Sequence, residues 1–217
     1  VNALPRRVIE NIYRGAKRFA SREMLEAQVA ANFPDPRVLD GWVERTDALG
    51  STGKLRAFPP RMVHMLAGNA PSSVLHSIAQ GALVKAVSLF KMPSNDMFTG
   101  VAILRTMADI DATHPLVKSM SAVYWKGGDE RIERTLYRPQ YFDKIAAWGG
   151  GDAINNVIKY PGPGIQLVSF DPKTSISMIG PEGFTSQAVI EDIAERTAND
   201  ATVFNQDACL ASRFVFV

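Results

Sequence analysis

Short apolar runs alternate with amphipathic segments along most of the chain after residue 60. The runs with the length and residue types of strands are 62–66, 86–90, 121–125, 142–147, 165–170 and 175–179. Apolar residues at helical spacing lie between them, over 72–84, 95–110, 130–137 and 182–199. Strands that alternate with helices need crossover connections, which produce a mostly parallel sheet with helices on both faces. The pattern therefore predicts an α/β fold.

The part before residue 60 has a different pattern, in which apolar residues recur at helical spacing. The helices that this pattern predicts lie over 5–19, 21–31 and 37–48. At the other end, residues 213–217 read as a strand that is only beginning, with no turn or cap behind it. We therefore expect the protein to continue beyond Val217.

Composition and charge narrow the function. The chain has 217 residues, of which 46% are hydrophobic and 21% charged, with a net charge of +2 and no Lys/Arg block. These values are typical of a globular protein and argue against nucleic-acid binding. No run is long and apolar enough to cross a bilayer, and no signal peptide opens the sequence. We therefore expect a cytoplasmic protein without a membrane span.

The carboxyl ends of the predicted strands carry the residues best suited to a ligand, because parallel sheets bind ligands at that edge. Gly149, Gly150 and Gly151 follow a strand directly, so their backbone N–H groups can approach a phosphate, although a plain tight turn explains them equally well. Lys91 ends another strand. It can bind a ribose hydroxyl or a phosphate, or it can be a solvated charge.

The single cysteine, Cys209, excludes an internal disulfide framework and a cysteine-rich metal site. The three histidines lack metal-ligand spacing, so we expect no metal. Most lone cysteines are buried small hydrophobic residues. A nucleophilic thiolate instead needs a polar, partly exposed turn, and Asn205-Gln206-Asp207 supplies that polarity. A helix beginning near Ala208 would stabilise the thiolate through its dipole.

The order of several motifs over residues 60–217 resembles the aldehyde dehydrogenase superfamily and, within it, the LuxC-like long-chain acyl-CoA reductases. These motifs are Gly68-Asn69-Ala70-Pro71, Lys91-x-Pro93-Ser94, Trp148-Gly149-Gly150-Gly151, Phe170-Asp171-Pro172-Lys173 and Asn205-Gln206-x-x-Cys209-x-x-x-Arg213. The resemblance implies a helical N-terminal portion at 1–58, a Rossmann-like dinucleotide-binding domain at 59–201 and the start of a catalytic domain at 202–217.

The resemblance also implies roles for single residues. Cys209 matches the nucleophile that becomes acylated, and Asn69 matches the asparagine that binds the oxyanion together with the Cys209 N–H group. Lys91 matches the lysine that holds the adenosine ribose. The remaining residues expected to bind the cofactor are Ser94, Trp148, Gly149, Gly150 and Gly151.

Two departures from the superfamily pattern indicate the direction of the reaction and the cofactor. Aldehyde dehydrogenases carry a glutamate that activates water where this chain has Ser169, and a serine hydroxyl cannot act as a carboxylate base. An acyl group on Cys209 would then be reduced by hydride rather than hydrolysed. Ser94 or Asn95 stands where NAD-preferring members often carry a glutamate, which favours NADPH. Asp96 lies nearby, so NADH stays open.

We therefore expect an enzyme that uses NADPH to reduce an acyl-CoA thioester, most simply a fatty one, to an aldehyde through a cysteine acyl-enzyme. The alternatives are an aldehyde dehydrogenase of the same superfamily and a non-catalytic nucleotide-binding module. The expected partners are the acyl-CoA substrate, further copies of the chain in a homo-oligomer and a protein that transfers acyl groups.

Overall fold

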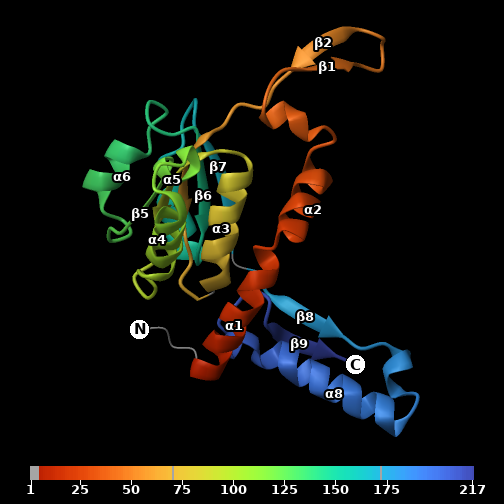
Figure 1. Ribbon diagram of the computed structural model, residues 1–217. Coiled ribbons are helices and arrows are strands. Elements are labelled where there is room, and N and C mark those ends of the chain that lie inside the picture. Colours follow the sequence, from red (N-terminus) through yellow and green to blue (C-terminus); the bar gives the residue numbers. More distant parts are fainter. Residues whose placement is uncertain (1–4, 70, 172) are drawn as a thin grey trace.

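The computed structural model describes residues 5–69, 71–171 and 173–217. Ala70 and Pro172 of the motifs, and the first residues of the predicted 1–58 portion, lie outside these ranges. Figure 1 shows an N-terminal arm of helices and a hairpin, a central sheet flanked by helices, and a C-terminal unit that contains the longest helix. Within the described ranges, no helix is long and apolar enough to span a membrane.

The central sheet has five strands in the order β5-β4-β3-β6-β7, and every neighbouring pair is parallel. These strands are β3 (Arg61–Met65), β4 (Val87–Lys91), β5 (Met120–Val123), β6 (Lys144–Trp148) and β7 (Gln166–Phe170). Val63 in the middle of β3 pairs with Leu89 on one side and Ile145 on the other. The predicted α/β fold with a parallel sheet is confirmed.

Helices cover both faces of this sheet. They are α3 (Pro71–Leu83), α4 (Thr99–Asp111), α5 (Pro115–Lys118), α6 (Glu130–Leu136) and α7 (Gly151–Val157). On one face, α3 and α4 pack against a core that includes Val74 and Phe90, both fully buried. On the other face, α6 and α7 pack against fully buried Val63 and Ile145. Side chains alternate between the two faces along each strand, which explains why adjacent strand residues belong to different cores.

The N-terminal arm contains α1 (Arg6–Phe19) and α2 (Arg22–Asn32), which confirms the first two predicted helices. The Ser21 hydroxyl caps α2 by accepting a hydrogen bond from the Met24 N–H group.

The helix predicted over 37–48 is wrong. That segment contains a single 3-10 turn, η1 (Pro36–Leu39), followed by an antiparallel hairpin of β1 (Val43–Thr46) and β2 (Thr52–Leu55). The Asp47 carboxylate accepts hydrogen bonds from the backbone N–H groups of Leu49 and Ser51, and Gly50 has a φ of +82°. These local bonds close a tight turn, and a glycine in the left-handed region ends helical propagation.

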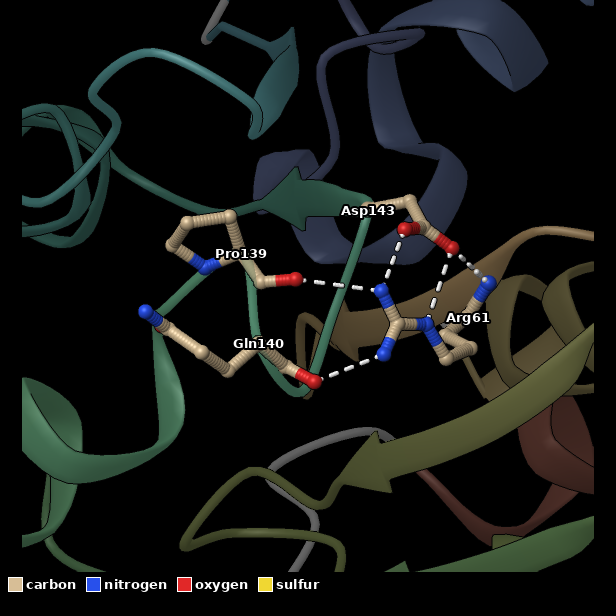
Figure 2. A network of polar contacts seen from close by, with 4 residues as sticks. All are labelled: Arg61, Pro139, Gln140 and Asp143. Atoms are coloured by element: carbon tan, nitrogen blue, oxygen red, sulfur yellow. Dashed lines mark hydrogen bonds and ion pairs between the residues drawn. The ribbon is translucent and has the colours of Figure 1, made fainter.

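A network of polar contacts closes the amino ends of β3 and β6 (Figure 2). The Asp143 carboxylate accepts from the Arg61 backbone N–H group at 2.8 Å and from the guanidinium at 2.6 Å. The same guanidinium also donates to the carbonyl oxygens of Pro139 and Gln140. Hydrogen bonding to Arg61 lowers the pKa of Asp143. The network fixes β6 beside β3 at the edge opposite the candidate site.

The C-terminal unit is a second small βαβ arrangement. It consists of β8 (Ser175–Met178), η2 (Pro181–Phe184), α8 (Gln187–Thr202), η3 (Val203–Gln206) and β9 (Ser212–Phe216). The strands β8 and β9 pair in parallel, with α8 as their crossover. The strand expected at the end of the chain is thus confirmed. A helix beginning near Ala208 is wrong, because the chain turns there and enters β9.

Candidate active site

The strand order of the sheet reverses between β3 and β6, which makes this position a topological switch point. From β3 the chain moves outward to β4 and β5, and it then returns to place β6 on the other side of β3. Loops beside such a switch point diverge and leave a crevice at the carboxyl edge. The loops that carry Asn69, Lys91 and Gly149 all follow strands of this region, so the structure gathers these predicted residues at one edge of one sheet.

Asn69 contacts the turn that carries Cys209. Its side-chain Nδ2 donates a hydrogen bond of 2.6 Å to the backbone carbonyl of Asp207, across 138 positions of sequence. Cys209 itself is exposed, and the buried residues Ala208 and Ala211 anchor the turn on either side of it. The predicted oxyanion residue therefore lies at the loop of the predicted nucleophile.

The turn before Cys209 has unusual backbone geometry. Phe204, Asn205 and Gln206 have φ values of 51°, 53° and 60°, which place three successive non-glycine residues in the left-handed region. Such conformations are disfavoured and cluster at functional sites. Because no helix begins at Ala208, the expected helix dipole does not act on the Cys209 thiol. Of the environment predicted for the Cys209 thiol, the polar turn is present and the helix is absent.

Asn95 ties the Asn69 loop to the loop after β4. Its side-chain Nδ2 donates to the Gly68 carbonyl oxygen at 3.2 Å, and its Oδ1 lies 1.5 Å from the position that a Cβ at Gly68 would occupy. Only glycine leaves room for this side chain where it lies. Ser94, the residue predicted to choose the cofactor, precedes Asn95 and is exposed.

Lys91 is buried at the end of β4, with 9% of its surface exposed, so it is not the solvated charge of the alternative interpretation. Its Nζ lies 5.5 Å from the centroid of the Trp125 ring, which follows β5. Burial lowers the pKa of Lys91, and the charge of Glu133 opposes that effect.

Glu133 is a residue that the sequence analysis missed. This α6 carboxylate is fully buried and accepts hydrogen bonds from Trp125 Nε1 at 3.3 Å, the Gly128 N–H group at 3.0 Å and Asn156 Nδ2 at 2.7 Å. One signal could have found it. Glu133 lies in an apolar helical stripe that includes Ile132 and Leu136, and an acidic residue in such a stripe must be buried with its partners.

The glycine loop after β6 combines one glycine that packing requires with two that it does not. A Cβ at Gly149 would lie 2.9 Å from the Cβ of Ala153, whereas Gly150 and Gly151 have nothing within 4 Å of theirs. The space above the last two glycines is therefore open to a ligand, although a plain turn at the start of α7 has the same geometry.

Trp148 lies on the opposite face of the sheet from Lys91. Its ring stacks on that of Phe170, with centroids 3.8 Å apart and planes 6° apart. Both rings line a cavity of about 330 Å³ between α2, α3 and the sheet. His64 also lines this cavity, and burial lowers its pKa to about 4.

Among the described residues, no group of His, Cys, Asp or Glu side chains is arranged to hold a metal ion.

The sequence pattern of the acyl-CoA reductase (LuxC) family matches residues 4–217. The chain belongs to this family. It is 35% identical over 180 residues to a long-chain acyl-protein thioester reductase of Aliivibrio fischeri, and 33% identical over 181 residues to that of Photorhabdus luminescens. Each match covers 82% of this chain and 35% of the relative. The chain thus spans about a third of the length of these curated relatives.

Solved structures of aldehyde dehydrogenases share the fold of this LuxC-family chain. A propionaldehyde dehydrogenase from the fucose-utilisation microcompartment of Clostridium phytofermentans has a TM-score of 0.62 and 16% identity, covering 95% of this chain and 47% of that one. An NAD-dependent benzaldehyde dehydrogenase from Corynebacterium glutamicum has a TM-score of 0.62 and 17% identity, covering 96% and 47%. The predicted resemblance to the LuxC family is confirmed, and so is the predicted aldehyde dehydrogenase-type fold.

Proposed function

We propose that the protein reduces a fatty acyl thioester to an aldehyde with a nicotinamide cofactor, through an acyl-enzyme on Cys209. The observation that carries this proposal is the hydrogen bond from Asn69 to Asp207, because it joins the carboxyl edge of the sheet to the turn of Cys209. Membership of the LuxC family and relatives named as acyl-protein thioester reductases support the same reaction class.

The first chemical step is attack of the Cys209 thiolate on the thioester carbonyl carbon. Negative charge develops on the carbonyl oxygen, and the Asn69 amide and the Cys209 N–H group donate to it. A carboxamide has two N–H donors, so the bond from Asn69 to Asp207 leaves one donor for the oxyanion. Collapse of the tetrahedral intermediate breaks the bond to the leaving thiol and leaves an acyl thioester on Cys209.

The residues at the carboxyl edge of the sheet suit a dinucleotide. Lys91 presents a buried ammonium at the carboxyl edge, and Gly150 and Gly151 leave open space beside it along the same edge. Bound NADPH supplies the hydride that reduces the acyl-enzyme. The resulting hemithioacetal on Cys209 then loses the thiolate and releases the aldehyde.

Ser169 supports reduction rather than hydrolysis. It is exposed on β7, next to the end of β6, with which it pairs through Ala147. A hydroxyl at this position cannot remove a proton from water at neutral pH as a carboxylate can. The acyl group on Cys209 therefore persists until hydride reaches it.

The experiment that tests this function uses the full-length protein that carries this sequence. We expect aldehyde to form from a fatty acyl-CoA and NADPH, and no aldehyde to form with Cys209→Ala. Oxidation of added aldehyde to acid would instead support the aldehyde dehydrogenase alternative, and cofactor binding without thiol chemistry would support a non-catalytic module.

The acyl donor has a second candidate, since the relatives are named as reductases of acyl groups carried by protein. The same assay with an acylated carrier protein in place of acyl-CoA separates the two donors. Aldehyde from the acyl-protein alone would assign the protein-bound thioester as the substrate.

Ser94 is proposed to favour NADPH over NADH because it places a neutral hydroxyl where a carboxylate would repel the 2′-phosphate. We expect Ser94→Glu to raise the Kd for NADPH by about tenfold and to leave that for NADH nearly unchanged. Titration of both cofactors measures the ratio, and an equal effect on both would remove Ser94 from the specificity site.

A further inference from the structure

The carboxylate of Glu133 links three segments at the carboxyl edge of the sheet. It lies on α6 and receives the Trp125 indole and the Gly128 N–H group from the loop after β5, and the Asn156 amide from α7. All three donors are neutral, and the carboxylate is fully buried. A buried charge that no cation compensates is strongly unfavourable, so the cations that interact with Glu133 are informative.

Lys91 interacts electrostatically with Glu133, and the Trp125 indole contacts both side chains. The Lys91 Nζ lies over the face of the Trp125 ring, 5.5 Å from the ring centroid. The indole N–H group of Trp125 donates a hydrogen bond of 3.3 Å to Glu133. An indole whose N–H group binds an anion carries more electron density on its face, which strengthens the attraction of a cation there. The Lys91 ammonium therefore lies over a ring, and within the described part of the chain it donates no hydrogen bond to the protein, so its donors are available to a ligand.

The electrostatic effect of Glu133 on Lys91 has a definite sign. Burial lowers the pKa of Lys91, and the negative charge of Glu133 raises it. The other titratable groups around Glu133 are Lys159, whose ammonium donates to Asn156 Oδ1 at 3.5 Å, and two tyrosines. The phenols of Tyr137 and Tyr160 have raised pKa values, chiefly because of burial. They are neutral near pH 7, so the anion that acts on Lys91 is Glu133.

We propose that Glu133 is a positioning residue of the cofactor site, which keeps Lys91 charged and aims its ammonium at the ribose and phosphate portion of a nicotinamide dinucleotide. This inference rests on the proposed role of Lys91 in cofactor binding. Glu133 itself is too deeply buried to contact the ligand, and it acts through Trp125 and Lys91.

A purely structural role for Glu133 makes a different prediction from a charge role. If Glu133 only joins α6 to α7, its loss weakens cofactor binding equally at every pH. If its charge maintains the Lys91 ammonium, replacing it with a neutral amide lowers the pKa of Lys91 further. The ammonium is then lost at a lower pH, so binding weakens as pH rises and stays near normal at low pH.

The experiment measures the Kd for NADPH and for NADH, by calorimetry on the full-length protein, between about pH 6 and about pH 9. Glu133→Gln is the test variant, and its matched control is Glu130→Gln on the same helix, an exposed carboxylate paired with Arg134. We expect Glu133→Gln to raise the Kd by about tenfold at the alkaline end, and by much less at the acid end. We expect Glu130→Gln to match the wild type.

A double-mutant cycle with Lys91→Met shows whether Glu133 acts through Lys91. The two substitutions should be non-additive, so Glu133→Gln should add nothing to the loss of affinity in the Lys91→Met background. Equal weakening in both backgrounds, without pH dependence, would overturn the inference. If Glu133→Gln does not fold, Glu133→Asp replaces it, since the shorter side chain withdraws the charge, and a wild-type pH profile for that variant would overturn it too.

The outcomes separate this inference from the proposed function. Wild-type protein that binds neither NADPH nor NADH would overturn both. Wild-type binding that Lys91→Met weakens, together with a Glu133→Gln variant that behaves as the wild type at every pH, would overturn only the role of Glu133.

Discussion

Two carboxylates at opposite edges of the central sheet show how the same chemical group can serve stability or a binding site. Asp143 at the amino edge has 42% of its side chain exposed and bonds directly to the Arg61 guanidinium. Glu133 at the carboxyl edge is fully buried and bonds to neutral donors, and one of these donors, the Trp125 indole, also lies against the Lys91 ammonium.

The two arrangements differ in whether the cation keeps hydrogen-bond donors that a ligand could use. At the amino edge, the Arg61 guanidinium is bonded to Asp143, Pro139 and Gln140, so its donors are used within the protein (Figure 2). At the carboxyl edge, the Lys91 ammonium rests on a ring and keeps its donors. The amino edge is thus closed by its own contacts, whereas the carboxyl edge is where we propose that the cofactor binds.

The largest expected effect at the carboxyl edge comes from Asn69→Ala. We expect kcat to fall by about 10²–10³, because one oxyanion donor is lost, while the Kd for the cofactor changes little. Steady-state turnover and calorimetry on the full-length protein measure the two quantities. Near-normal turnover would show that Asn69 is not the oxyanion donor. It would also contradict the proposal that the carboxyl edge serves catalysis while the amino edge serves stability.

A smaller effect is expected from Gly68→Ala, which tests how the Asn69 loop is held. The new methyl group would displace the Asn95 side chain and remove its bond to the Gly68 carbonyl, so we expect kcat to fall by about tenfold. Gly162→Ala, which meets nothing within 4 Å and lies in the loop before β7, away from the candidate site, is the matched control for steric effects. Equal turnover of Gly68→Ala and the wild type would contradict the positioning role of Asn95.

The smallest effect on function is expected at the amino edge. Arg61→Ala should lower the melting temperature by a few degrees and leave cofactor affinity unchanged, because its contacts only join β3 to β6. The pKa of Asp143 is lowered in the folded state, so this pair stabilises the fold above the unfolded pKa and stops doing so as pH falls through the folded pKa. Thermal melts at neutral and acid pH test this, and a variant as stable as the wild type at neutral pH would refute it.

Periodicity predicted the central sheet well because its strands are short apolar runs buried on both faces, as in β3 and β6. It failed over 37–48, where the apolar spacing of a helix is present by chance and the outcome depends on Asp47 and Gly50 closing a turn. The helix that would have stabilised a Cys209 thiolate is also absent near Ala208, because the chain turns there and enters a strand that pairs with β8, which is distant in sequence. A single-segment pattern does not contain that pairing.

The residues of the candidate site also differ in how well the sequence alone could predict them. Asn69, Lys91 and Cys209 could be named from motifs, since each is a residue type with its own chemistry in a loop or at a strand end. The position of Glu133 in the apolar stripe of its helix could have predicted that it is buried while Glu130 faces solvent, but only the fold shows which donors it accepts from and that Lys91 lies nearby. Long-range partners such as Asn69 and Asp207 likewise emerge only from the fold.

The most direct test of the central claim is intact-mass analysis of the full-length protein after mixing with a fatty acyl thioester in the absence of reduced cofactor. Wild-type protein should gain the mass of one acyl group, Cys209→Ala should gain none, and addition of NADPH should remove the adduct and release aldehyde. An adduct that persists in Cys209→Ala, or no adduct with either an acyl-CoA or an acyl-protein of any chain length, would contradict the account.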